Sequence, residues 1–393
     1  MSSTTDVRVG ITDVVGWAAT FDAIAAGERE RERTGSAPFA QVRMLAEQGY
    51  GRLRLPVELG GAGLSVEEVI ELTVDLAAAD SNVAHIWRNH LLFVESVRAD
   101  PELYRPWLSD LHDGFVFGLG FGETGMPRAG LQDFTTTLTR REGGWVLDGV
   151  KFYSTGNLYA DRIVVQAATD DGVAHAIVPA DRAGIVRLDD WDGIGQRFTG
   201  SGTTRFDRVA VRDDEVIAPE RLDRPGRRPS PLAQLYLSAV VAGITAAAAR
   251  EAVTLVQGRG RNYFHGLAEE PRHDPLLQET VGQLSADAFA ARAVVVAAAR
   301  TLDLAVSDGG VPAMEAASLD AARAKATVDR IATRATSGLL DAGSASAVRE
   351  GTALDRFWRN ARTVIAHNPA SYKLRVLGEH LLNGTPPPEG SFF

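Results

Sequence analysis

The segment FTTTLTRREGGWVL, residues 134–147, decides the fold of the middle of this chain. From Phe134 to Leu138 the side chains alternate in character, as they do where one side of a β-strand is buried. Residues 141–144, REGG, then turn the chain into a new apolar run that begins at Trp145. Two such runs joined by a glycine-containing turn are typical of a β-hairpin.

The strand pattern continues toward the C-terminus. Ile163 to Ala168 and Val173 to Val178 are short β-rich runs, separated by a turn at Asp170-Asp171-Gly172. Thr203 to Val211 alternates again. Because hairpin turns join consecutive strands, we predict a central antiparallel β domain over residues 113–222.

Residues 1–112 are expected to form a helical domain. Ser65 and Glu68 have the spacing of a capping box, in which each side chain bonds to the backbone of the other residue. The apolar residues that follow recur at helical spacing. A second helix is predicted from Asn82 to Arg98.

The pattern after residue 230 returns to long helices. Asp274-Pro275 supplies a capping acceptor before a proline at the first helical position. Apolar residues from Leu277 to Val295 then recur at alternating spacings of four and three, which predicts a packing seam in a helix bundle. Further helices are expected over 312–340, 346–366 and 369–383, and a linker over 221–230.

Composition excludes several classes of function. The 393 residues include 41 Lys+Arg and 51 Asp+Glu, a formal charge of −10, so we predict no nucleic-acid partner and no anionic membrane surface as a partner. The chain has no cysteine, which excludes disulfides, thiolate metal sites and cysteine nucleophiles. The eight histidines lack metal-ligand spacing, so no metal site is predicted.

The location of the protein is inferred from its apolar segments. Met1 to Gly10 is polar and shows no apolar stretch preceded by positive charge, so we expect no secretory signal. The run from Val294 to Ala299 is too short to span a bilayer. We therefore predict a cytoplasmic protein.

Common catalytic motifs are missing. No Gly-x-Gly-x-x-Gly opens a helix after a strand, and no phosphate loop, His-Glu-x-x-His or Gly-x-Ser-x-Gly pattern occurs. Spacing alone therefore predicts an α+β protein and leaves its chemistry open.

Several segments, in order, resemble the acyl-CoA dehydrogenase superfamily. They are LPVELGGAGLS at 55–65, WVLDGVKFYSTGN at 145–157, GQRFTGSGT at 195–203, and the positions of Arg261 and Gln278. Together they cover almost the whole chain. The resemblance implies an α+β fold with an N-terminal helical domain, a central antiparallel β domain and a C-terminal four-helix bundle over 230–393, assembled as a homotetramer.

One segment departs from the dehydrogenases of that superfamily. The Glu-Gly-Thr segment, which in dehydrogenases follows the last long helices, occurs here earlier, at 350–352. Two other segments resemble the flavin-dependent monooxygenase branch, typified by dibenzothiophene monooxygenase. They are HNPASYK, residues 367–373, which occupies the terminal loop position, and the segment from Ser81 to His90.

The resemblance implies roles for the histidines. In this branch, reduced flavin and oxygen form a hydroperoxide at ring carbon 4a, and it decays to peroxide unless water is excluded and donors hold its oxygens. His367 is assigned to hydroperoxide stabilisation or proton transfer, and His90 to a second polar contact on the substrate side. Capping of its own helix end is the alternative for His367. His85, about one turn earlier than His90, is interpreted as structural.

Flavin-binding positions follow from the same resemblance. Tyr153 would contact the isoalloxazine ring, Thr155 would bond near its reactive nitrogen and take part in catalysis, and Arg261 would hold phosphate across a subunit boundary. The full set is Thr124, Tyr153, Thr155, Trp191, Arg197, Ser201 and Arg261. A strand end, a packed tryptophan and a surface arginine are the ordinary alternatives for such residues.

We therefore predict a two-component monooxygenase. It would take reduced FMN or FAD, with FMN preferred, from a separate NAD(P)H-dependent flavin reductase, and oxygenate a small aromatic, heterocyclic, amine or sulfur substrate. Two alternatives stay open. One is an FAD-dependent acyl-CoA dehydrogenase with a displaced base such as Glu350, and the other is a non-catalytic relative that only binds ligands.

Overall fold

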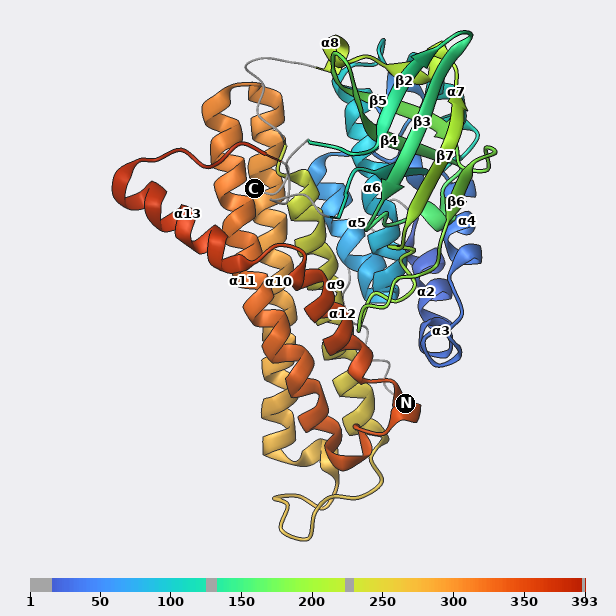
Figure 1. The fold of residues 1–393 in the computed structure, drawn as a ribbon. Coiled ribbons are helices and arrows are strands. Elements are labelled where there is room, and N and C mark those ends of the chain that lie inside the picture. The colour runs from blue at the N-terminus through green and yellow to red at the C-terminus, as the bar shows by residue number, and fades with distance from the viewer. Residues whose placement is uncertain (1–15, 125–132, 223–229, 391–392) are drawn as a thin grey trace.

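A computed structural model describes residues 16–124, 133–222, 230–390 and 393. Most of the expected linker at 221–230, and residues 125–128 of the loop that follows Thr124, lie outside the described residues. In chain order the structure has a helical region, a sheet and a second helical region (Figure 1). Helices α5 and α6 lie between the sheet and the long C-terminal helices (Figure 1).

The N-terminal helices begin where the sequence provides caps. Ser65 Oγ accepts from Glu68 N at 3.1 Å and Glu68 Oε2 accepts from Ser65 N at 2.7 Å, so the predicted capping box is confirmed. Asp80 caps the next helix by accepting from Asn82 N at 2.9 Å. The helices are α2 (Ala18–Ala26), α3 (Glu28–Thr34), α4 (Phe39–Glu47), α5 (Val66–Ala79), α6 (Ser81–Ala99) and α7 (Leu108–His112).

The sheet has the strand order β6-β7-β3-β2-β4-β5-β8, and β1 pairs with β4. The predicted hairpin is confirmed, because β2 and β3 pair antiparallel with Arg141 opposite Gly144. The strands are β1 (Phe117–Gly120), β2 (Thr137–Arg141), β3 (Gly144–Lys151), β4 (Arg162–Thr169), β5 (Gly172–Pro179), β6 (Ile185–Arg187), β7 (Thr204–Val211) and β8 (Val216–Ile217), followed by the short helix α8 (Pro219–Leu222).

The sheet is mixed rather than purely antiparallel. β1 pairs parallel with β4, and Thr137 of β2 pairs parallel with Ala168 of β4. The expectation of an antiparallel domain was based on hairpin turns, and such turns govern only strands that are consecutive in the chain. β1 and β4 are not consecutive, so their pairing carries no turn signal.

The C-terminal region is a helix bundle. Asp274 caps α10 by accepting from Leu276 N at 3.0 Å, as predicted. The expected helix over 346–366 begins only at Asp355, because Ala353 takes a left-handed backbone conformation (φ 51°) and interrupts it. The helices are α9 (Leu232–Gly258), α10 (Pro275–Asp308), α11 (Val311–Gly343), α12 (Asp355–Ala366) and α13 (Ala370–Asn383).

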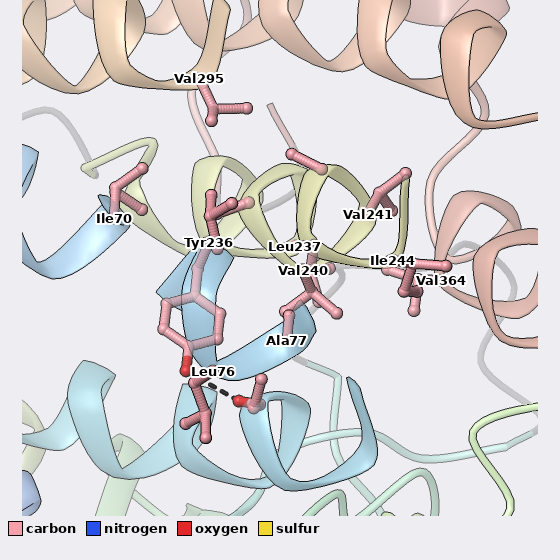
Figure 2. Close-up of a cluster of buried hydrophobic side chains, with 14 of the residues drawn as sticks. Ile70, Leu76, Ala77, Tyr236, Leu237, Val240, Val241, Ile244, Val295 and Val364 are labelled. Carbon is pink, nitrogen blue, oxygen red and sulfur yellow. Dashed lines mark hydrogen bonds between the residues drawn. The ribbon is translucent and has the colours of Figure 1, made fainter. Parts of the chain in front are cut away.

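Helix α9 is the centre of the molecule. It packs against α5, α10, α11 and α12, and Figure 2 shows Tyr236, Leu237 and Val240 of α9 among side chains from these neighbours. Tyr236 Oη also donates to Ala84 O of α6 at 2.7 Å (Figure 2). By length and composition α9 could cross a bilayer, although the sequence analysis had considered only the run at 294–299. However, 89% of the most apolar window of α9 is buried inside the protein. This burial is that of a core helix.

Candidate active site

Polar side chains gather where the sheet domain meets the bundle. One face of α6 contributes Ser81, His85, Arg88 and Asn89, whose spacing of three and four residues aligns them on one side of the helix. Opposite this face lie the loop after β3, the loop between β6 and β7, the first turn of α9, and the junction between α12 and α13.

His85 is held by a glutamine from the β6–β7 loop. Its Nδ1 lies 3.0 Å from Gln196 Oε1, while Gln196 Nε2 donates to Ser81 Oγ at 2.9 Å. Gln196 N donates to Asn360 Oδ1 of α12 at 2.6 Å, which ties the loop to the bundle. Because the glutamine presents its oxygen, His85 carries its proton on Nδ1, and Nε2 is the unprotonated nitrogen.

The electrostatics keep His85 neutral. Burial, together with the nearby charge of Arg88, lowers its pKa to about 4. At neutral pH this imidazole is therefore uncharged, with one nitrogen fixed by Gln196 and the other available to accept a proton.

His367 ends α12, directly before Asn368-Pro369. Asn368 Nδ2 donates to Gln234 Oε1 in the first turn of α9 at 3.3 Å, which anchors this junction next to α6. Enclosure by protein atoms, with the positive charge of Arg88 as the next cause, lowers the pKa of His367 to about 3. The side chain nevertheless keeps an exposed surface. His85 also acts on the pKa of His367, so the two imidazoles lie within electrostatic range of each other.

His90 lies elsewhere. Its Nε2 is 2.9 Å from Gly51 O and its Nδ1 accepts from Phe117 N at 3.1 Å, so both ring nitrogens are engaged with backbone groups. Its ring also packs edge-on against Trp87. This geometry gives the expected substrate-side role of His90 no support, because no ring nitrogen remains for a ligand. The same geometry favours His85, which had been interpreted as structural.

Thr155 and Ser201 come together as the sequence predicted. Thr155 Oγ1 is 2.7 Å from Ser201 Oγ, Ser201 Oγ is 2.7 Å from Thr199 Oγ1, and Thr199 Oγ1 donates to Gln196 O at 2.8 Å. Asn89 Nδ2 of α6 donates to Thr155 O at 2.7 Å. A continuous chain of hydroxyls therefore leads from Thr155 to the glutamine that holds His85.

Two aromatic rings and one arginine border these hydroxyls. Tyr153 is 67% exposed, and its ring stands edge-on to Trp191 with centroids 6.2 Å apart. Tyr153 and Gln196 both adopt left-handed backbone angles, φ 53° and 52°, which are unfavourable for residues other than glycine. Arg197 is exposed, and its guanidinium has no hydrogen-bond or ion-pair partner in the part of the chain that the structure describes.

The loop that carries Thr124 is anchored by an ion pair that the sequence did not reveal. Glu123 Oε1 accepts from Lys151 Nζ at 2.7 Å, and both side chains are buried. Glu123 also accepts from the backbone N of Thr135 and Thr136, and these bonds together lower its pKa to about 2 against the opposing effect of burial. Thr124 itself is exposed.

Arg261 is not part of this cluster within one chain. It lies exposed in the connection between α9 and α10, at the opposite end of the bundle from the sheet (Figure 1). The 27 residues of α9, about 40 Å at 1.5 Å per residue, separate it from the first turn of α9 at the site.

Comparison with known proteins identifies the family. Residues 120–209 match the family described as acyl-CoA dehydrogenase, middle domain, and residues 235–372 match acyl-CoA dehydrogenase, C-terminal domain. The L-evernosamine nitrososynthase of Micromonospora sp. is 30% identical over 373 residues, which is 90% of this chain and 86% of that relative. The chain belongs to the acyl-CoA dehydrogenase superfamily.

Within this superfamily the chain is a flavin-dependent monooxygenase. A probable FMNH2-dependent monooxygenase of Pseudomonas putida, SfnC, is 29% identical over 369 residues, or 91% of each chain. The FMN-bound structure of TdsC from Paenibacillus sp. A11-2, a dibenzothiophene monooxygenase, superposes with a TM-score of 0.88 at 27% identity, covering 98% of this chain and 100% of that chain. The methanesulfinate monooxygenase MsuC from Pseudomonas fluorescens gives 0.84 at 27% identity, covering 95% and 99%.

These findings confirm the predicted fold and reaction class. The dehydrogenase alternative relied on Glu350, which lies exposed in a short 3-10 turn before α12. The non-catalytic alternative is not supported either, since the monooxygenase relatives align over nine-tenths of the chain.

Proposed function

We propose that this monooxygenase takes reduced FMN from a separate NAD(P)H-dependent flavin reductase and uses oxygen to oxygenate a small organic substrate. One observation carries the proposal: two neutral imidazoles, His85 and His367, lie within electrostatic range of each other, and Gln196, which holds His85, joins the hydroxyl chain that begins at Thr155. FMN is preferred over FAD because SfnC is described as FMNH2-dependent and the TdsC structure contains FMN.

The described residues fit a flavin mononucleotide. The exposed ring of Tyr153 and the half-buried ring of Trp191 suit a planar ring system, and the hydroxyls of Thr155 and Ser201 suit its polar edge. Arg197, exposed and without an acidic partner among the described residues, suits a phosphate. Thr124, at the end of the loop anchored by Glu123, is a further contact for the ring.

Bound reduced flavin supplies the electrons and the atom at which oxygen reacts. The protein holds the oxygens and moves the proton. His85 accepts or returns a proton at Nε2, because Gln196 fixes Nδ1, and His367 is the second neutral imidazole, within electrostatic range of His85. The pairing replaces the predicted pair of His367 and His90. Apolar packing behind α6 keeps water from the reacting atoms.

A homotetramer would complete the flavin site. Arg261 is too far from its own chain's site to contact the same flavin, which is consistent with a contact to the flavin of a second subunit. The adjoining Phe264 is fully exposed in the single chain, as a residue covered by another subunit would be. The cytoplasm, where flavin reductases and NAD(P)H are available, is the proposed location.

Anaerobic titration with reduced FMN and reduced FAD, followed by rapid mixing with oxygenated buffer, tests the proposal. Tighter binding of FMN and a transient near-ultraviolet band distinct from oxidised FMN would support it. Immediate reoxidation without such a band would contradict it and return attention to acyl-CoA substrates and Glu350. In the positive case, compounds of the kinds that the relatives are named for, sulfur heterocycles, amino sugars and sulfinates, are the first to assay.

A further inference from the structure

Arg88 is an enclosed arginine without an acidic partner. It lies on the reactive face of α6, where Nε donates to Ala233 O at 3.0 Å and Nη1 donates to Asn89 Oδ1 at 3.3 Å. Both acceptors are neutral, and Nη2 makes no hydrogen bond to any residue that the structure describes. Burial lowers the pKa of Arg88 to about 10, so the guanidinium remains charged at neutral pH.

The two most buried arginines among the described residues are paired with carboxylates. Arg54 bonds to Glu95 at 2.8 Å, and Arg356 bonds to Glu28 at 2.8 Å. Taking a charge out of water is expensive unless an opposite charge compensates it, and these two follow that rule. Arg88, which is half-buried, has no such carboxylate among the described residues.

No carboxylate in the described structure is available near Arg88. Lys325 of α11 is paired with Asp329 at 2.9 Å. The charged groups that lower the pKa of His367 are Arg88, Lys325 and Lys373, all of them positive. Of these, Arg88 has no carboxylate partner among the described residues.

We propose that Arg88 binds an anionic group of the substrate, and that the substrate is a small organic oxyanion, a sulfinate, sulfonate or carboxylate. This inference rests on the proposed function, because it assigns a ligand class to the same site. The unused Nη2 beside Nη1 offers the paired donors that oxyanions bind. His85 lies three residues earlier on the same face, so an anion held by Arg88 has its remaining atoms beside the two imidazoles.

The flavin phosphate is a poorer candidate for this position. Arg197, exposed in the β6–β7 loop directly after Gln196, has no acidic partner among the described residues and suits a phosphate. Arg88 instead bonds to Ala233, next to Gln234, whose side chain holds Asn368 and thereby the His367 junction. Arg88 is thus tied to the junction that carries His367, a contact that Arg197 does not make among the described residues.

The test compares matched anions and neutral compounds on the intact enzyme with reduced FMN bound, under anaerobic conditions. Benzenesulfinate, benzenesulfonate and benzoate are the anions, and methyl phenyl sulfone and benzamide are the neutral partners. Dissociation constants are measured by calorimetry for the native enzyme and for Arg88→Gln, Arg88→Lys and Arg197→Gln. The three anions together distinguish a sulfur oxyanion from a carboxylate as the preferred ligand.

We expect the native enzyme to bind at least one anion about 10-fold or more tightly than its neutral partner. Arg88→Gln should weaken that anion about 10- to 100-fold and leave the neutral compounds nearly unchanged, because a charge-assisted hydrogen bond is lost. Arg88→Lys should recover part of the loss. Arg197→Gln should weaken reduced FMN and leave anion binding by the FMN-saturated enzyme unchanged.

Equal binding of anions and neutral compounds by the native enzyme would overturn the inference without any variant. So would an Arg88→Gln enzyme that loses reduced FMN but keeps anion affinity, since Arg88 would then serve the flavin. Failure of the proposed function is a separate result: the native enzyme would then bind no reduced FMN or show no transient band with oxygen.

Discussion

His85 and His90 lie on the same helix, and by burial and pKa they are alike. Their exposed fractions are 8% and 2%, and burial lowers the pKa of each to about 4. They differ in what holds them. His90 is fixed at both nitrogens by backbone groups, whereas His85 is fixed at one nitrogen by the side chain of Gln196.

The difference separates a structural histidine from a reactive one. Gly51 precedes α5 and Phe117 lies in β1, so His90 joins the N-terminal helical region to the sheet. The helix face that carries His85 meets loops whose conformations are strained, at Tyr153 and Gln196. A low pKa therefore identifies neither role, and the decisive feature is whether a ring nitrogen remains for a ligand.

The largest expected effect concerns catalysis on the His85 face. We expect His85→Ala and His367→Ala each to lower the yield of oxygenated product per oxygen consumed by about a thousandfold, with hydrogen peroxide formed instead. Proton transfer and oxygen binding are lost, while reduced FMN still binds. Product and peroxide are measured together at saturating flavin.

The double variant provides the control. If the two histidines act on the same oxygens, the double variant should be scarcely worse than either single one. Unchanged coupling in His367→Ala would remove this residue from the site.

The second-largest effect concerns stability and comes from His90, on the other face of α6. His90→Ala should lower the free energy of unfolding by about 3 kcal/mol, because it leaves a cavity and two buried backbone groups without partners. His85→Ala should cost about half as much, since one side-chain hydrogen bond is lost. Urea unfolding monitored by circular dichroism compares the two variants.

Gly51→Ala is a matched test of the same contact. A Cβ at Gly51 would lie 2.5 Å from His90 Nε2, so the methyl group should push the imidazole from its place. Full stability in Gly51→Ala would show that this packing is looser than the structure implies.

The comparison also shows what sequence could predict. The hairpin at 134–147, the capping box at Ser65 and the cap at Asp274 were all predicted correctly, because each depends on residues that are neighbours in the chain. The parallel pairing of β1 with β4 was missed, since it joins segments that are distant in the chain. The late start of α12 was missed because Ala353, with φ 51°, gives no signal in its side chain.

At the site, the resemblance pointed to His367, Thr155, Ser201 and His90, whereas the hydrogen bonds of α6 favour His85 over His90. One sequence signal could have corrected this. Ser81, His85 and Asn89 recur at intervals of four, which places three polar side chains on one side of an otherwise buried helix. His90 is flanked on its own side by Trp87 and Val94, which is the pattern of a core position. Arg88 gave no signal, because its lack of an acidic partner is visible only in three dimensions.

A smaller effect is expected in the dependence of stability on pH. His85 has a folded-state pKa of about 4 against 6.5 when exposed. Between these values the unfolded state binds a proton that the folded state does not, so the free energy of unfolding decreases as pH falls from 6.5 to 4. His85→Gln removes one such group. As pH falls, the free energy of unfolding of the variant should therefore decrease by about 1.4 kcal/mol less per pH unit than that of the native protein. Urea unfolding at several pH values gives both slopes, and parallel slopes would contradict a buried neutral His85.

The smallest effect should come from the group that orients Gln196. Ser81→Ala removes the acceptor for Gln196 Nε2, one neutral buried hydrogen bond worth about 1 kcal/mol. The glutamine is then free to rotate and present its nitrogen to His85, which would favour the other tautomer. We therefore expect product coupling to fall severalfold while stability changes little. Nitrogen-15 NMR of the histidine ring reports the tautomer directly. Thr336→Val is the matched control, because it removes one buried hydroxyl on α11 that bonds to Ala332 O of its own helix at 2.7 Å. If Ser81→Ala and Thr336→Val had the same effect on coupling, the glutamine would not be what distinguishes His85 from His90.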